Sequence, residues 1–139
     1  MKIILIVLFN ILVLTNSYSQ NFDNLNCDSL FYEYEVIYHK YHTVSKMVEI
    51  LGNLDSVRQY FYERVKCLLP EQKEYKLLIG VIVDTLGNVI CSKKYLGIND
   101  TIDSLAIATV KEFKFNPAEV RNKKIQMRGM IVLMNRKNK

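Results

Sequence analysis

One short stretch, Phe113-Lys114-Phe115-Asn116-Pro117-Ala118, limits the folds open to this chain more than any other. It follows a segment with helical spacing of apolar residues and precedes a long apolar run. Pro117 has no backbone N–H and pushes Asn116 out of the helical region, so a helix cannot continue through it. Phe113 and Phe115 lie beside this boundary, where large rings pin a helix to a sheet. We therefore assign Phe115 and Pro117 structural roles.

Two amphipathic helices are predicted around this boundary. The first covers 54–68, with apolar residues on one stripe and Asn53 as its N-cap. The second covers 101–113, with Asp100 as its cap. Asp103 then falls in the first turn, where the helix dipole favours a carboxylate.

Three strands are predicted with these helices. Tyr75 to Val83 is almost entirely apolar, so both of its faces are expected to be buried. The segment 84–88 is a hairpin connection containing Asp84 and Gly87, since Gly87 adopts positive φ at no steric cost. A return strand over 89–96, a polar turn at 121–124 and a last strand over 125–134 follow. The fold class is therefore α+β, a small three-stranded antiparallel sheet packed with two helices in the order α-β-β-α-β.

The first residues have the pattern of a secretory signal. Met1-Lys2 precedes an apolar run from Ile3 to Leu14, and Ser17 and Ser19 have the spacing that a signal peptidase reads. A spanning helix needs about 20 apolar residues, so an uncleaved anchor is the less favoured alternative. We divide the chain into a signal peptide (1–19), an N-terminal extension (20–45), a domain (46–135) and a basic tail (136–139). Cleavage after Ser19 is expected to leave residues 20–139 outside the cytoplasm.

The N-terminal extension is rich in tyrosine and has two overlapping periodicities. Tyr32, Tyr34 and Tyr38 alternate with polar residues as in a strand, whereas Leu30, Tyr34 and Ile37 fit a helix. The aromatic and β-branched content favours extended structure. The tyrosines have the stacking faces that bind sugars or peptidoglycan, but packing of an aromatic strand against the domain is the favoured interpretation.

The three cysteines allow one disulfide in an oxidising compartment, with one thiol left over. Cys91 falls in a predicted strand and is expected to be a small buried residue. The predicted disulfide is therefore Cys27–Cys67.

Charge and motifs exclude several classes of function. From Arg121 to the end the chain has seven basic residues and no acidic one, a pattern that suits nucleic acid, anionic lipid or an acidic partner. Secretion argues against nucleic acid, and we interpret the tail as a solvated end. No catalytic or phosphate-binding motif is present. His39 and His42 share a face only in a helix, and extended structure is favoured here, so we predict no metal site. Because catalytic and phosphate-binding motifs are missing, we also predict no cofactor and no enzyme.

Three motifs in order resemble the TonB C-terminal domain: Val83-Asp84-x-x-Gly87-x-Val89, then Ile102-Asp103-Ser104-Leu105-Ala106, then Phe115-x-Pro117-Ala118. That family typically has a strand ending in V-D-x-x-G-x-V, a helix with L-D-x-x-A, and F-x-P-A before a final strand. Upstream, Lys46 to Asp55 is similar to the K-M-P-E-F-P-G-G-x-x segment of TonB-like proteins of the Bacteroidetes type. The resemblance covers about residues 46–134.

The chain also departs from that family. Val48, Leu51 and Asn53 replace two prolines and a glycine of the upstream segment. Typical TonB proteins have an uncleaved anchor that engages inner-membrane motor proteins, and a long Pro-rich arm. This chain has only Pro70 and Pro117, so it lacks a stiff polyproline arm that spans distance. Direct transmission of force is therefore not expected of it.

The resemblance implies a function in peptide binding and a location in the periplasm, or on the periplasmic face of the inner membrane if the N-terminal segment is retained. The family adds a short segment of an outer-membrane receptor as a strand to an exposed sheet edge, in transport across the envelope. Here the final strand is the natural edge, with Gln126 and Arg128 as polar contacts. An alternative is a secreted structural or adaptor domain in which this strand only completes the core, and pairing with a second copy is another. The expected binding residues are Ile125, Gln126, Met127, Arg128, Gly129, Met130 and Ile131.

Overall fold

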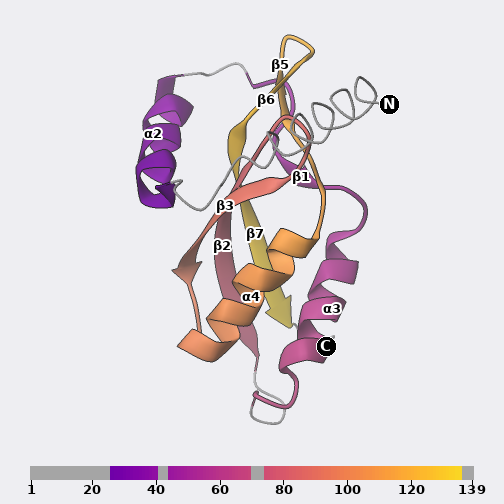
Figure 1. Ribbon diagram of the computed structural model, residues 1–139. Helices are drawn as coiled ribbons and strands as arrows, with labels where there is room; N and C mark the ends of the chain where they lie inside the picture. The colour runs from indigo at the N-terminus through magenta and orange to yellow at the C-terminus, as the bar shows by residue number, and fades with distance from the viewer. Residues whose placement is uncertain (1–25, 41–43, 70–73, 136–139) are drawn as a thin grey trace, which may run out of the picture.

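The computed structural model describes residues 26–40, 44–69 and 74–135, which form a mixed α+β fold with three helices and several antiparallel sheets (Figure 1). The mixed class and the antiparallel sheets agree with the prediction. The helices are α2 (Cys27–Lys40), α3 (Leu54–Val65) and α4 (Asp100–Glu112). The strands are β1 (Glu49–Ile50), β2 (Tyr75–Val83), β3 (Val89–Leu96), β4 (Phe115–Asn116), β5 (Ala118–Val120), β6 (Lys123–Ile125) and β7 (Met127–Asn135).

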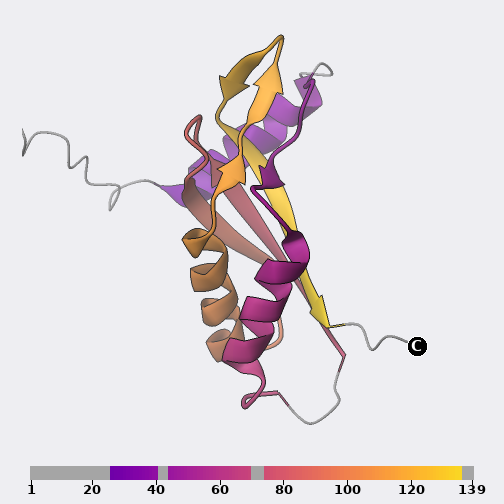
Figure 2. The ribbon, with the colours of Figure 1, turned by 90° about the vertical axis from the view of Figure 1, so that its right-hand side faces the viewer.

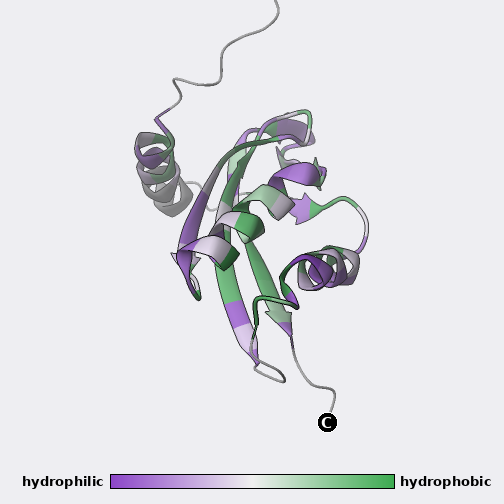
Figure 3. Ribbon diagram, turned by 60° about the horizontal axis from the view of Figure 1, so that its bottom comes forward, coloured by the Kyte–Doolittle hydropathy of each residue, from purple (hydrophilic) through white to green (hydrophobic). Residues whose placement is uncertain are grey.

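The main sheet has the strand order β3-β2-β7, and both of its pairings are antiparallel. The apolar strand β2 is central, as its burial on both faces requires. Its pairing with β7 is unbroken, from Tyr75 opposite Asn135 to Val83 opposite Met127. Hydropathy colouring shows the apolar character of β2 and β7, which contrasts with the more polar helix α3 (Figure 3).

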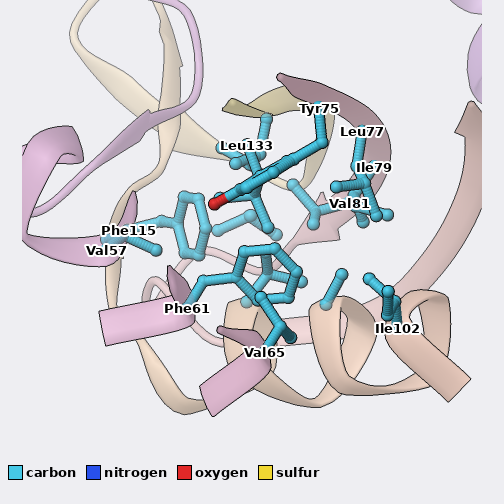
Figure 4. Packing of buried hydrophobic residues seen from close by; sticks show 14 residues of the cluster. Val57, Phe61, Val65, Tyr75, Leu77, Ile79, Val81, Ile102, Phe115 and Leu133 are labelled. Atoms are coloured by element: carbon cyan, nitrogen blue, oxygen red, sulfur yellow. The ribbon is translucent and has the colours of Figure 1, made fainter. Parts of the chain in front are cut away.

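Helices α3 and α4 lie side by side over one face of the sheet, which we call the core face (Figure 2). Phe61 of α3 and Ile102 of α4 meet alternate residues of β2 and β7, including Ile79 and Leu133 (Figure 4). Phe115 is also buried here, in agreement with its predicted structural role. Alternation along β2 and β7 thus supplies one continuous apolar layer for both helices.

The helix ends follow local side-chain chemistry. Asn53 caps α3 as predicted, and its side chain accepts a hydrogen bond from the Asp55 N–H at 2.8 Å. The prediction that Asp100 caps α4 was wrong: Asn99 is the cap, and its side chain accepts from the Ile102 N–H at 3.0 Å. The earlier residue adopts the extended backbone that a cap requires, so Asp100 becomes the first helical residue.

The opposite face of the sheet, here the α2 face, corrects two predictions. The region from Cys27 to Lys40 is a helix, not an extended segment. Its Phe31 packs on Ile82 and Cys91, so tertiary packing overrides the strand-like composition. The predicted Cys27–Cys67 disulfide is also wrong. Cys27 bonds Cys91, with Cα atoms 5.6 Å apart, whereas Cys67 is free and exposed.

Two small ladders lie beyond the main sheet. β1 pairs with β4, and β5 pairs with β6 in a hairpin. The hairpin connection is the predicted polar turn, and Arg121 and Asn122 both have positive φ there. The single last strand predicted from Ile125 to Met134 is instead two strands, because Gln126 separates β6 from β7. Ile125 therefore pairs with Ala118 and does not belong to the main sheet.

Several sequence predictions lie outside the described residues. These are the signal peptide (1–19), His42, Pro70 and the basic tail (136–139). Within residues 26–40, 44–69 and 74–135, no helix is both long and apolar enough to cross a membrane.

Candidate functional site at the outer edge of β7

The candidate site is the outer edge of β7, which among the described strands has a sheet neighbour on only one side, in the order β3-β2-β7. In an antiparallel strand, the N–H and C=O of one residue point to the same side, and this side alternates along the strand. The Val132 carbonyl points outward, since it accepts a bond from helix α3. The same alternation directs the backbone groups of Arg128, Met130 and Met134 away from β2.

Helix α3 occupies part of this edge through one side chain. The Arg58 Nε donates to the Val132 carbonyl oxygen at 3.2 Å, and its Nη1 lies 2.9 Å from the Asp55 carboxylate. Asp55 thereby holds the guanidinium in place along the helix. The outer edge is therefore closed at Val132, and the segment Arg128–Met130 lies on the far side of this contact from the end of β7.

A cleft of about 660 Å³ continues the edge between α3 and the end of β7. Its volume is within the range of about 300–1,000 Å³ typical of ligand sites. The side chains that line it are Asp55, Arg58, Gln59, Tyr62, Tyr75, Met134 and Asn135.

The two predicted polar contacts of the edge turn toward the α2 face. The Gln126 Nε2 donates to the Tyr34 hydroxyl of α2 at 2.9 Å. The Arg128 guanidinium lies 5.1 Å from the centre of the Tyr95 ring on β3, and its Nη2 is 3.8 Å from the Met130 sulfur. Both side chains thus have partners within the chain.

The other predicted residues of β7 divide between the two faces. Met127 and Ile131 are buried, and Gly129 lies on the core face where an added Cβ would meet Val48 at 2.8 Å. Met130 is 40 % exposed on the α2 face. The edge therefore offers a peptide backbone groups and the Met130 side chain.

Three residues of the family-like motifs meet at one structural junction. The Gly87 carbonyl accepts from the Phe115 N–H at 3.0 Å, and a Cβ on Gly87 would lie 2.2 Å from the Phe115 carbonyl oxygen. The φ of Gly87 is +84°, so glycine is required for both reasons. Asp84 fixes the same turn by accepting from the N–H groups of Leu86 and Asn88. These residues therefore join the β2–β3 hairpin to the chain that leads into β7.

Asp103 is a buried structural carboxylate near the start of α4. It accepts from the Lys94 ammonium at 2.7 Å and from the Ile98 N–H at 2.8 Å, and it is only 4 % exposed. Burial alone raises the pKa of this carboxyl, but the bonds from Lys94 and Ile98 outweigh it and hold the pKa below its ordinary value. Asp103 is therefore charged at neutral pH and ties α4 to β3.

Sequence reasoning missed Arg58, Tyr95 and Gly80. Arg58 reads as an ordinary polar residue of an amphipathic helix, and its contact with Val132 crosses 74 residues of sequence. Tyr95 lies at an irregularity in the pairing of β3 with β2, which alternation does not reveal. A glycine within the apolar strand was a usable signal, because Gly80 marks a close approach of side chains.

No group of three or more His, Cys, Asp or Glu side chains in the described parts of the chain is arranged to hold a metal ion. Comparisons with protein-family models, with curated proteins and with solved structures find no match to this chain. The geometry of the sheet is therefore what a functional proposal has to build on.

Proposed function

We propose that this chain is a periplasmic binding module that takes an extended peptide of an outer-membrane receptor as an added strand on β7. The terminal position of β7 in the sheet carries this proposal, because its outward N–H and C=O groups suit main-chain pairing. The resemblance of the motifs to TonB C-terminal domains supports the choice of partner. The Cys27–Cys91 disulfide supports an oxidising compartment.

Arg58 limits where such a peptide pairs. Because the Arg58 Nε already donates to the Val132 carbonyl, an added strand first pairs with Arg128 and Met130. Extension past Val132 requires displacement of Arg58 into the adjoining cleft. Arg58→Ala is therefore expected to tighten peptide binding several-fold, whereas Arg64→Ala, a matched change on the same helix away from the edge, is expected to leave it unchanged.

The decisive experiment uses proline to remove a single outward donor. The Met130 N–H points away from β2, so Met130→Pro deletes an edge donor and preserves the β2–β7 pairing. Fluorescence anisotropy with N-terminal peptides of outer-membrane receptors is expected to show loss of binding for Met130→Pro and for Arg128→Glu. Ser92→Pro, the equivalent change at the opposite edge on β3, is expected to bind as the unmodified chain does.

Circular dichroism of each variant checks that the fold survives. Ile131→Pro serves as the disruptive reference, since it removes an N–H that faces β2. Equal peptide binding by the unmodified chain and Met130→Pro contradicts the proposal.

The adaptor alternative has one observation in its favour. The contact of Arg58 with Val132 blunts the edge in the way that native sheets protect unpaired strands. In that case β7 only completes the core, and Arg58→Ala promotes self-association without any gain in peptide binding. Sedimentation of this variant distinguishes the two functions.

A further inference from the structure

Within residues 26–40, 44–69 and 74–135, the α2 face of the main sheet is covered at one end only. Helix α2 crosses the end near Ile82 and Cys91, and it lies on the side of the sheet opposite α3 and α4 (Figures 1 and 2). Beyond it, alternation places a set of apolar side chains on the same face, with Leu78 opposite both Leu96 and Val132. We call this set the open patch. It consists of Leu78, Tyr95, Leu96, Met130, Val132 and Met134.

The open patch is accessible and has an adaptable surface. Tyr95 and Leu96 on β3 and Met130 on β7 flank the central strand β2, and each of the three is 40 % or more exposed. Leu78, lying between Leu96 and Val132, is half-buried. Methionine side chains repack easily against different partners.

Tyr95 marks the boundary between the covered and open parts of the face. A pairing irregularity between Leu78 and Ile79 turns its ring across Gly80, where an added Cβ would lie 2.5 Å from the ring. Phe31 of α2 contacts the same ring edge-on, with centroids 6.3 Å apart. The open patch is therefore continuous with the sheet surface on which α2 packs.

The charge of this sheet has one sign. The strands β2, β3 and β7 contain lysine and arginine but no aspartate or glutamate. Lys76 is exposed opposite Met134 at the end of the open patch, and Arg128 lies over Tyr95 at the other end. An apolar patch between basic side chains favours an acidic partner.

Helix α2 shows which kind of element this face accepts. Its Asp28 carboxylate lies 2.9 Å from the Lys93 ammonium of β3, and its Phe31 is buried to 2 % exposure on the sheet. One carboxylate and one apolar anchor, both on the same side of a helix, thus meet a lysine and an apolar strand surface. A partner helix with the same chemistry has the same complementarity with the open patch.

We propose that the open patch binds an acidic amphipathic helix of a partner protein, which docks next to α2 on the same face of the sheet. Its apolar side packs on Met130 and Leu78, and its carboxylates pair with Lys76 and with the basic end near Arg128. A second copy of this chain is disfavoured, because face-to-face packing brings Lys76 and Arg128 of both copies together. This site shares Met130 and Arg128 with the β7 edge, but it engages side chains on the sheet face, whereas an added strand pairs with outward backbone groups. Lys76 on β2 belongs to the open patch and not to the β7 edge.

The test uses the disulfide-bonded protein and two synthetic helical peptides. Both carry leucine on one side, and the other side carries glutamate in one peptide and lysine in the other. NMR titration is expected to show binding of the glutamate peptide at least about tenfold tighter than the lysine peptide. The shift changes are expected at Leu78, Met130 and Val132.

Variants locate the binding on the open patch. Lys76→Glu and Met130→Glu are each expected to weaken binding of the glutamate peptide about tenfold. Leu86→Glu is the matched control, because Leu86 is 80 % exposed in the β2–β3 turn, away from the open patch. Lys76→Glu also separates this site from the β7 edge, since receptor-peptide binding at Arg128–Met130 is expected to survive it.

Three outcomes overturn the proposal. Equal affinity for the two peptides shows only apolar adhesion. Binding of anionic phospholipid vesicles that Met130→Glu abolishes, with no binding of the glutamate peptide at about 1 mM, identifies a membrane surface instead. A dimer in sedimentation that Met130→Glu dissociates identifies a second copy as the occupant.

Discussion

The two faces of the main sheet are covered in different ways. On the core face, α3 and α4 bury a cluster of fourteen described residues that includes Phe61 of α3 and Phe115 of β4. On the α2 face, the buried cluster among the described residues consists of Phe31, Ile82 and Cys91, and a disulfide holds the helix in place. The core face therefore supplies most of the apolar burial that drives folding, while the α2 face depends on a covalent tether.

This difference separates stability from interaction. A face that is filled by its own helices leaves no room for a partner. A face that is half-covered by a tethered helix keeps apolar side chains exposed to solvent, and a partner can cover them. Four predictions test this separation, in order of decreasing effect.

The largest effect is expected on the core face. Phe61 is fully buried, so Phe61→Ala is expected to lower the free energy of unfolding by about 3–5 kcal/mol in urea titrations. Gln59→Ala, an exposed change on the same helix, is expected to change it by less than about 0.5 kcal/mol. Phe31→Ala is the same substitution on the α2 face, and it is expected to lower the free energy of unfolding by less than Phe61→Ala does. Equal costs for both phenylalanines would show that the two faces form one cooperative core.

Loss of the disulfide is expected to act mainly on α2. Cys27→Ser opens a link between residues 64 apart, for which the loss is typically about 2–4 kcal/mol. Hydrogen exchange is expected to show lost protection in α2 and retained protection in α3 and α4. The control is Cys67→Ser, since that thiol is free and exposed. Uniform loss of protection in all three helices contradicts the separation of the faces.

Gly80→Ala tests how closely α2 and Tyr95 pack on β2. The new methyl group meets the Tyr95 ring at 2.5 Å and the Phe31 ring at 3.0 Å. Overpacking of this kind costs about 1–3 kcal/mol, and the lower end is expected because the exposed Tyr95 ring is able to swing outward. Adding Tyr95→Ala to Gly80→Ala is expected to restore part of the lost stability, as measured by the midpoint temperature of thermal unfolding. No recovery would place the strain elsewhere.

The smallest effect concerns acid stability on the core side of the sheet. Asp103 has a pKa below its ordinary value, so its ion pair with Lys94 stabilises the fold above the ordinary aspartate pKa. That contribution is lost as the pH falls below about 4, through the lowered pKa. Asp103→Asn is expected to cost about 1 kcal/mol at pH 7 and to flatten the acid limb of a stability–pH profile. An unchanged profile would assign the acid limb to the other described carboxyls with a lowered pKa, which are Glu63, Asp84 and Glu112.

Sequence reasoning predicted the core face well and the α2 face poorly, for a physical reason. The segments 54–68, 75–83 and 101–113 have a single clear periodicity, because their partners cover one stripe or both faces. The α2 segment fits two periodicities, and contacts with β3 and β7 far along the chain decide between them. The Cys27–Cys67 prediction was wrong for the same reason, because the pairing of Cys27 with Cys91 requires α2 to lie over β3.

The candidate site was predictable in part. Strand order places the final strand at an edge, and β7 lies there. The side chains that close or line this edge depend on long-range contacts, of which Arg58 with Val132 is an example. Glycine usually signals positive φ, but the two positive-φ positions of the β5–β6 hairpin are Arg121 and Asn122. The sequence therefore predicts only a polar turn there.

The position of β2 between β3 and β7 has a consequence for how the chain assembles. Pairing with β3 starts from Val83 and Val89, six residues apart, whereas Val83 and Met127 are separated by 44 residues. Loop-closure entropy makes the second pairing about 2 kcal/mol more costly to start. Until β7 arrives, the most apolar strand of the chain has an unpaired edge, which is a template for contact with other chains. The rate at which β7 docks therefore sets how long a newly made molecule is prone to aggregate.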